Sequence, residues 1–444
     1  MITPSSLYRY SSSTTSTDHQ SIKLLAEEAR TTYTAHENFS NTLLMAARLE
    51  TDHNQPDTSA RLKEALDQNI PATQQFRAVL FGSWINMLLI LVPIGFAVNY
   101  SHINSIAVFI INFVAILPLA AMLSYATEEL ALRTGETLGG LLNASFGNAV
   151  ELIVSIQALF KNKILIVKTS LIGSMLSNLL LVLGMCFFFG GISRLEQFFN
   201  LTLAQTATSL LAICISGLII PTVFHYMLLV EDTNANFLKN QELSHGTALI
   251  MLIIYFCYLF FQLKSHAMMY KEPSKRVEKR NGNLDKGTSS RTIVKIGAIT
   301  AASAVGTAQI NFTREEDIEE SQLTLSGALI PLGISTTLIA FCSEFMVNSI
   351  QSITEGDKVS AVFVGLILIP IVGNAAEHAT AVTMAIKDQM DLAISVAVGS
   401  SMQIALFILP LIVIVGWVAG KECMMLYFNA FQIAILFMTI LLVN

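Results

Sequence analysis

The chain is poor in charged residues. Only 13% of its 444 residues are Asp, Glu, Lys or Arg, whereas 53% are hydrophobic. A water-soluble fold of this length needs more charge, so the composition excludes a soluble globular protein and indicates a membrane protein. The five cysteines show no paired spacing, which argues against a disulfide framework or a thiolate metal site. No phosphate-binding glycine loop is present, and no charged-then-apolar signal segment opens the chain.

Apolar runs long enough to cross a bilayer are frequent. About 30 Å of hydrocarbon requires roughly 20 residues of helix at 1.5 Å per residue. The sequence therefore predicts an all-α polytopic membrane protein with about ten spans. They are expected near residues 80–98, 104–126, 138–160, 164–192, 202–224, 244–263, 323–350, 359–386, 391–418 and 424–443.

Polar segments divide the chain into parts. Residues 1–79 are expected to form a polar, disordered cytosolic tail, and residues 80–98 an extra first span. Two groups of spans follow at 99–263 and 323–444, separated by a polar insert at 264–322. The basic residues of this insert place it in the cytosol. An acidic tract near its end either attracts cations or regulates access, or is a solvated linker. It consists of Glu315, Glu316, Asp317, Glu319 and Glu320.

One short motif occurs twice. The pentapeptide Gly-Asn-Ala-Val-Glu at 147–151 returns as Gly-Asn-Ala-Ala-Glu at 373–377, each copy well inside an apolar run. An ionised carboxylate near the bilayer centre costs about 2.5–3.5 kcal/mol on insertion scales, so two at corresponding places indicate an ion pathway. The same offset superposes Ser174 on Ser400, which extends the repeat over a second helix.

The two copies fall in the third and eighth predicted spans. These spans are five crossings apart, so the helices run in opposite directions through the membrane. Two similar units of inverted topology are typical of secondary transporters whose site lies at the midplane between repeats. Antiparallel packing is expected to bring Glu151 and Glu377 face to face, where one divalent cation bridges them.

Neighbouring polar residues suit a hard cation. Asn148 and Asn374 each stand three residues before their glutamate, on the same helix face. The glycines that open the motifs are expected to loosen the helix and free backbone carbonyls. Carboxylate, amide and carbonyl oxygens together with water can supply the six to eight ligands that calcium takes, whereas the absence of thiolates argues against copper or structural zinc.

The partner spans and the second motif add further candidates. Polar residues there are supporting groups of the cation site, although serines in spans more often serve helix packing. They are Ser174, Ser177, Asn178, Ser400, Gln403 and His378, of which His378 is either a supporting group, a proton relay or a ligand. Glu129 and Glu344 are weaker candidates for lining access cavities. Lys168, near the start of a span, is expected to extend to the membrane interface.

Longer strings around these residues resemble the calcium/proton exchangers of vacuolar type, within the calcium/cation antiporter superfamily. The strings are ATEELALRTGETLGGLLN at 126–143, GNAVE at 147–151, GNAAEH at 373–378 and GSSMQI at 399–404. The resemblance implies that Glu151 and Glu377 are the cation- and proton-exchanging carboxylates, assisted by neighbouring Asn, Ser and Gln oxygens. It also implies an acidic cytosolic insert, which 315–320 matches, and eleven spans. Because this chain stops after the tenth predicted span, we expect the C-terminal eleventh span to be missing.

Two buried carboxylates cannot both stay ionised without a counter-charge, so they hold either protons or one divalent cation. The sequence therefore predicts an antiporter, not an enzyme, that moves calcium from the cytosol into a vacuole or other acidic organelle in exchange for protons. Calcium is the transported substrate, and no cofactor is predicted. The predicted partners are calcium ions, protons and the lipid bilayer, with no nucleic acid; a homo-oligomer is left open.

The same residues leave two alternative interpretations. A sodium-driven calcium or manganese exchanger of the same superfamily is the alternative within transport. An intramembrane hydrolase or a receptor with structural carboxylates is the alternative of another class. It is disfavoured because neither a Gly-x-Ser-x-Gly motif nor an intramembrane Asp pair is visible.

Overall fold

A computed structural model describes most of the chain after the tail. The described residues are 70–101, 104–134, 136–192, 194, 196–228, 234–266, 322–354, 359–421 and 423–443. Within these ranges the chain is helical and contains no strand, which confirms the all-α prediction. Residues 1–69 and the acidic tract at 315–320 lie outside the described residues.

The first described helices form a right-angled corner. Helix α3 (Ala72–Phe81) is followed by η2 (Trp84–Ile90) and α4 (Leu91–Tyr100), and the two arms meet at 88°. Ser83 begins the second arm, where its Oγ accepts a hydrogen bond from the Ile85 N–H. The predicted tail therefore extended too far, because residues 72–79 are helical. Apolar residues at 76, 79 and 80 give this segment a helical period that its polar neighbours obscure.

Six helical rods are long and apolar enough to cross a membrane. The single helices among them are α5 (Ser105–Thr134), α10 (Leu201–Leu228) and α14 (Leu325–Thr354). The composite rods are α8 (Ile164–Leu176) with η3 (Ser177–Val182) and α9 (Leu183–Gly191), α11 (Asn234–Phe260) with η4 (Phe261–Ser265), and α18 (Met390–Gln403) with η6 (Ile404–Ile408) and α19 (Leu409–Val418).

Broken or short helices occupy the remaining predicted spans. The copy at 147–151 separates α6 (Glu136–Phe146) from α7 (Ala149–Phe160). The copy at 373–377 lies where α15 (Ala361–Phe363), η5 (Val364–Leu368) and α16 (Ile369–Gly373) meet α17 (Ala375–Ile386) with a bend of 60°. The final helix, α20 (Ala430–Val443), has 14 residues. Counting each bent pair as one span gives at most eight in the described chain, compared with about ten predicted.

Wide helical turns occur at matching places in the two repeats. The π-helical turn η3 follows Leu176 in the first repeat, and η6 follows Gln403 in the second. Such turns are rare in helices and often mark functional sites. Both adjoin the helical segments that carry the predicted polar groups.

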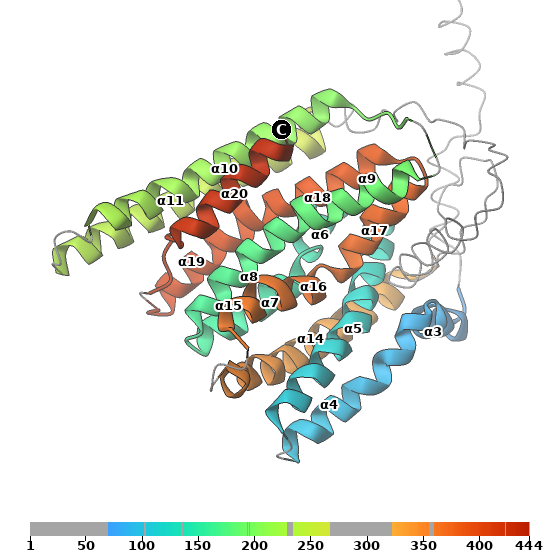
Figure 1. Ribbon diagram of the computed structural model, residues 1–444. Coiled ribbons are helices and arrows are strands. Elements are labelled where there is room, and N and C mark those ends of the chain that lie inside the picture. The colour runs from blue at the N-terminus through green and yellow to red at the C-terminus, as the bar shows by residue number, and fades with distance from the viewer. Residues whose placement is uncertain are drawn as a thin grey trace, which may run out of the picture. The chain divides into compact units, whose positions relative to one another are not determined.

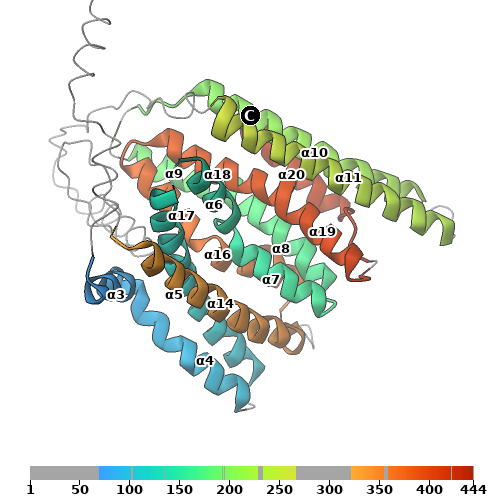
Figure 2. The same ribbon diagram turned by 180° about the vertical axis from the view of Figure 1, so that it is seen from behind.

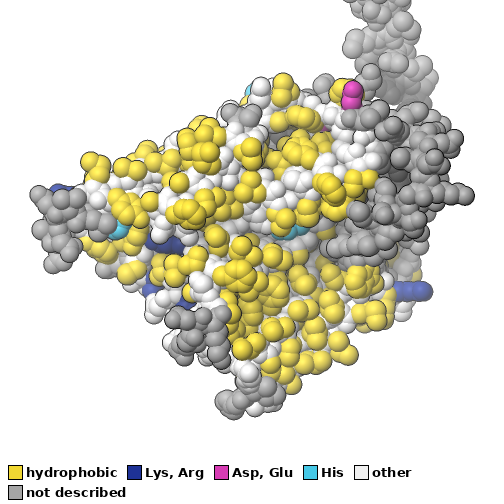
Figure 3. All heavy atoms as spheres, in the orientation of Figure 1, with side chains coloured by type: hydrophobic (Ala, Val, Ile, Leu, Met, Phe, Trp, Pro, Cys, Tyr) yellow, Lys and Arg dark blue, Asp and Glu magenta, His cyan; other side chains and the backbone are white. Residues whose placement is uncertain are grey.

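The helices pack in a reciprocal way. Helices α5 and α14 lie side by side, and α10, α11 and α20 lie along one side of the bundle, where α10 packs on α18 and α11 on α19 (Figures 1 and 2). Helix α7 packs on α14 and α8, whereas α17 packs on α5 and α18, so each broken helix contacts a long helix of the other repeat. Close approach of α8 to η5 needs glycine, because a Cβ on Gly173 would lie 2.2 Å from the Leu366 carbonyl oxygen. The outer face seen in Figure 3 is largely hydrophobic.

Candidate functional site

The two glutamates of the repeated motif lie in the first turns of α7 and α17. Asn148 and Asn374 occupy the breaks just before these helices, with φ near −100°. The helix is interrupted at Gly147 and Asn148 in the first copy and at Asn374 in the second, so each asparagine lies at the start of the helix that carries its glutamate. The amino-terminal end of each short helix carries unpaired N–H groups and a positive dipole end, which favours a nearby carboxylate.

Each motif leaves space for the carboxylate of the other. A Cβ on Gly373 would lie 2.3 Å from Glu151 Oε1, and a Cβ on Gly147 would lie 3.3 Å from Glu377 Oε1. Glu151 of α7 therefore lies against the helix break before α17. Glu377 of α17 lies against the helix break before α7. Segments more than 200 residues apart meet here, and the carboxylates interact electrostatically.

The Glu377 carboxylate is held by hydrogen bonds. Ser400 on α18 donates from Oγ to Glu377 Oε2 at 2.5 Å. Asn178 in η3 donates from Nδ2 to the same Ser400 oxygen at 3.0 Å. A hydroxyl has one hydrogen, so the Ser400 proton goes either to Glu377 Oε2 or to Asn148 Oδ1 at 3.0 Å, and the shorter contact with the charged group favours the carboxylate.

His378 lies behind this network. Its Nε2 is 3.1 Å from Asn178 Oδ1 and 3.5 Å from Ser177 Oγ, and the side chain is 9% exposed. It therefore contacts the residue that orients Ser400, and neither glutamate is among its hydrogen-bond partners.

The two asparagines make corresponding contacts with unequal completeness. Asn148 donates to Gln403 Oε1 at 2.9 Å, and its own Oδ1 lies 3.0 Å from Ser400 Oγ. Asn374 donates from Nδ2 to Ser174 Oγ at 3.0 Å, but its buried Oδ1 has no hydrogen-bond partner.

Glu151 is the least satisfied polar group of the site. It is 4% exposed, and neither carboxylate oxygen has a hydrogen-bond partner outside its own residue. Buried acceptors without partners are costly, so these oxygens and Asn374 Oδ1 are positioned to receive a proton or a cation.

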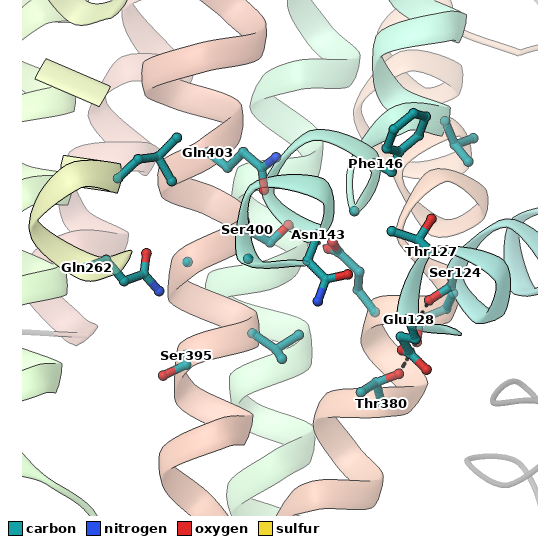
Figure 4. Close-up of a pocket in the computed structure, with 18 of the residues that line it drawn as sticks. Ser124, Thr127, Glu128, Asn143, Phe146, Gln262, Thr380, Ser395, Ser400 and Gln403 are labelled. Atoms are coloured by element: carbon teal, nitrogen blue, oxygen red, sulfur yellow. Dashed lines mark hydrogen bonds between the residues drawn. The ribbon is translucent and has the colours of Figure 1, made fainter. Parts of the chain in front are cut away.

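A cavity of about 410 Å³ leads to Glu377 but not to Glu151. It extends from the end of the bundle where α5 and η4 end and α18 begins, and Figure 4 shows polar side chains along it. Its polar lining includes Ser124, Glu128, Gln262, Thr380, Ser395 and Gln403. Of these six residues, only Gln403 is predicted from the sequence. The others looked like ordinary polar residues at helix ends, and no spacing signal distinguishes them.

Three weaker expectations are wrong. Glu129 is buried, and its Oε2 accepts hydrogen bonds from the N–H groups of Gln322 and Leu323, whereas its neighbour Glu128 lines the cavity. Glu344 forms an ion pair with Lys161 at 3.0 Å and does not line the cavity. Lys168 does not extend outward, as it is 9% exposed and donates to the backbone oxygen of Tyr427.

The donor set is rich in oxygen. Among the described residues, no group of three or more His, Cys, Asp or Glu side chains could hold a metal ion. Two carboxylates supplemented by neutral amide and hydroxyl oxygens form a different kind of site, which suits a hard divalent cation in transit. Helices broken at corresponding motifs around such a site define a secondary cation transporter.

Comparison with known proteins agrees with this class. The chain belongs to the sodium/calcium exchanger protein family, whose model matches residues 104–264 and 327–444. It is 42% identical over 368 residues to a vacuolar calcium ion transporter of Schizosaccharomyces pombe, covering 83% of this chain and 79% of the relative. It is 39% identical over 377 residues to vacuolar cation/proton exchanger 2 of Oryza sativa subsp. japonica, covering 84% and 77%.

A solved structure has the same fold. Native YfkE is 32% identical to this chain and superposes with a TM-score of 0.60, over 80% of this chain and 90% of that one. The resemblance drawn from the motifs is therefore confirmed at the level of family and fold.

Proposed function

We propose that this protein is a calcium/proton antiporter of the vacuolar membrane, which moves calcium out of the cytosol in exchange for protons. Relatives that cover most of the chain are vacuolar calcium transporters and cation/proton exchangers, and YfkE is a Ca²⁺/H⁺ antiporter. The observation that carries the residue assignment is the reciprocal placement of Glu151 and Glu377, each against the glycine of the other motif.

Exclusive occupancy explains the coupling. The ion pairs among the described residues lie elsewhere, so no lysine or arginine of this part pairs with either glutamate. Two buried carboxylates then require two protons or one divalent cation, and exchange of these loads is electroneutral. A lumen about 1.5 pH units more acidic supplies roughly 4 kcal/mol for two protons, at about 1.4 kcal/mol per tenfold. Transport needs no catalytic step.

Neutral oxygens complete the proposed cation site. Asn374 Oδ1 lacks a partner, and Asn148 Oδ1 contacts only a hydroxyl that can rotate away. With both carboxylates and water, these amides approach the six to eight oxygens that calcium takes. Ser400 and Asn178 then fix Glu377, while Gln403 and Ser174 fix the asparagines.

Inverted repeats are part of the proposal. The two motifs break their helices at the same place, the π-helical turns follow at corresponding positions, and α7 and α17 cross-pack on α14 and α5. An in-plane axis between the motifs accounts for all three features. We infer ten spans, with α6 and α7 forming one broken span and α20 the last.

The cavity is the proposed cytosolic access path. Its lining includes Gln262 and Leu263 of η4, at the start of the insert predicted at 264–322. The basic residues of that insert place this end in the cytosol. The described conformation is thus the one in which Glu377 communicates with the cytosol. The acidic tract ends two residues before Gln322, whose N–H donates to Glu129, the neighbour of the cavity-lining Glu128.

A single set of vesicles tests the proposal. Calcium-45 uptake is measured with an acid interior, with the pH gradient collapsed, and with an outward sodium gradient instead. We expect uptake only with the pH gradient, and its loss in Glu151→Gln and in Glu377→Gln with normal expression. Glu344→Gln, outside the cavity, serves as the matched control and should retain uptake. Uptake driven by sodium favours the alternative exchanger, and robust proton-driven uptake by either glutamine variant would refute the paired-carboxylate site.

A further inference from the structure

A second cluster of titratable groups surrounds the loop 419–429, which joins α19 to α20. Lys168 on α8 donates from Nζ to the Tyr427 carbonyl oxygen at 3.0 Å and lies 3.6 Å from the centroid of the Tyr427 ring. His225 on α10 stacks on the same ring, with centroids 3.8 Å apart and planes at 16°. Two groups this close cannot share one face, so the tyrosine ring lies between the ammonium and the imidazole.

The loop is held on the surrounding helices by backbone hydrogen bonds. The Leu426 N–H donates to Ser244 Oγ on α11 at 2.6 Å, and the Phe428 N–H donates to Thr222 Oγ1 on α10 at 3.2 Å. Together with Lys168, these contacts dock the loop on α8, α10 and α11. Helix α8 carries Ser174 of the cation site, so the loop is joined directly to a helix of that site.

Asn240 is the hydrogen-bond partner of the His225 ring. Asn240 Nδ2 lies 2.9 Å from His225 Nδ1, so Nδ1 is an acceptor and carries no proton in this arrangement. The other amide atom, Asn240 Oδ1, is buried without a hydrogen-bond partner. Rotation of the amide by half a turn would present Oδ1 to a protonated Nδ1. The pocket therefore already contains an acceptor suited to the protonated ring.

Among the described side chains, Lys168 is the cation that contacts the Tyr427 ring. On α11, Lys239 and Glu242 are exposed, and the charged residue of α18, Asp391, bonds Asn200 at the opposite end of α10. Helix α20 has no titratable side chain. Also on α11, the buried His245 lies beside Ser244 and stacks on Trp417, and Lys421 at the start of the loop donates to Asn162. Burial, together with Tyr226 and Cys423, raises the pKa of the Tyr427 phenol, so the ring stays neutral.

We propose that His225 is a proton-binding site, separate from the glutamate pair, that controls the docking of loop 419–429. Proton uptake places a second cation on the ring that already binds Lys168, and repulsion between them loosens the loop from α8 and α11. The proposed orientation puts this loop on the lumenal side, and that placement alone rests on the proposed function. An acidic lumen would then release the lumenal end when protons are available for exchange.

Hydrogen–deuterium exchange of the full-length protein in detergent tests this proposal without any transport. The reporters are the amides of Leu426 and Phe428, measured near pH 4.5 and near pH 7.5, because burial and repulsion from Lys168 mean that the ring takes up its proton at a lower pH than the usual value near 6.5. Rates are corrected for intrinsic exchange. We expect corrected protection to fall at least about tenfold at the lower pH, the scale of repulsion between unit charges roughly 7 Å apart at an effective dielectric constant near 20.

Three variants decide the cause. His225→Phe keeps a stacked ring that cannot bind a proton, and Lys168→Met removes the opposing cation, so both should stay protected at the two pH values. His245→Phe is the matched control, since His245 also stacks on a ring, Trp417, at 4.4 Å, and it should behave as the wild type. The proposal is overturned if wild-type protection is independent of pH or if both variants lose protection in acid as the wild type does. Loss at both pH values in both variants would show a purely structural cluster and would also overturn it. Failure of calcium uptake to depend on protons would leave these results unaffected.

Discussion

The contact between Gly373 and the Glu151 carboxylate gives the sharpest test of the site. A methyl group on Gly373 would lie 2.3 Å from Oε1 and 2.8 Å from Cδ of Glu151. Ordinary contact begins near 3.4 Å, so the carboxylate or the break before α17 must move by about 1 Å, several times the roughly 0.2 Å tolerance of metal–ligand distances. We expect Gly373→Ala to lower apparent calcium affinity at least about tenfold and to destabilise the fold by about 1–3 kcal/mol.

The measurement is a calcium titration of proton-driven calcium-45 uptake, with thermal unfolding of the same protein in detergent. Gly184→Ala is the matched control, because no heavy atom lies within 4 Å of its added Cβ. This control should transport normally. A Cβ on Gly147 would lie 3.3 Å from Glu377 Oε1 and 2.8 Å from the Asn143 carbonyl oxygen. Gly147→Ala should therefore displace the carboxylate less, and lower calcium affinity less, than Gly373→Ala, and its main cost should be in stability.

A double substitution separates this contact from general damage. Glu151→Asp shortens the side chain by one methylene and withdraws the carboxylate from Gly373. Alone it should weaken calcium binding, but in the Gly373→Ala background it relieves the clash. The two losses should therefore combine to less than their sum, with a coupling energy of about 0.5–3 kcal/mol. Strict additivity, or wild-type affinity in Gly373→Ala, would refute the reciprocal packing of glycine and glutamate.

Three further predictions follow from the same contacts. Asn374→Ala removes an amide oxygen that has no other partner, so apparent calcium affinity should fall roughly tenfold (about 1.4 kcal/mol) with coupling to protons intact. Asn148→Ala should instead mainly slow uptake, because it releases Ser400 and Gln403. Equal effects of the two substitutions on affinity and rate would contradict this assignment. Neutralising the acidic tract at 315–320 should slow uptake chiefly at low calcium and low ionic strength, since its potential falls off over about 8 Å at physiological salt, and an unchanged salt titration would make it a simple linker. Arg194→Met breaks an ion pair with Asp388 whose side chains are 4% and 5% exposed, so the free energy of unfolding should fall by about 3–5 kcal/mol. Lys161→Met breaks a pair with Glu344 whose side chains are 38% and 36% exposed, so the free energy of unfolding should change by at most about 1 kcal/mol. Similar losses of stability in a thermal or denaturant assay would contradict the role of burial.

Local sequence patterns determined the class of this protein. Long apolar runs, scarce charge and a repeated pentapeptide are properties of contiguous residues, and they suffice to predict helices, a membrane setting and paired carboxylates. The glycines of the two motifs predict the helix breaks. The sequence does not indicate that residues 72–79 are helical, because a single amphipathic turn around Phe76 is a weak signal among polar residues.

Tertiary structure decided which polar groups meet. Lys168 has the same sequence signature as a lysine that extends to the membrane interface, and only the docking of loop 419–429 buries it against Tyr427. In the same way, the paired charges of Arg194 and Asp388 lie on different repeats and carry no shared motif. The sequence by itself determined that two glutamates sit in corresponding helices. The tertiary structure decided that each glutamate rests against the glycine of the other motif and that the cavity reaches Glu377 rather than Glu151. Both features depend on how broken helices from distant parts of the chain cross. The spacing of residues along one helix carries no information about the helix opposite.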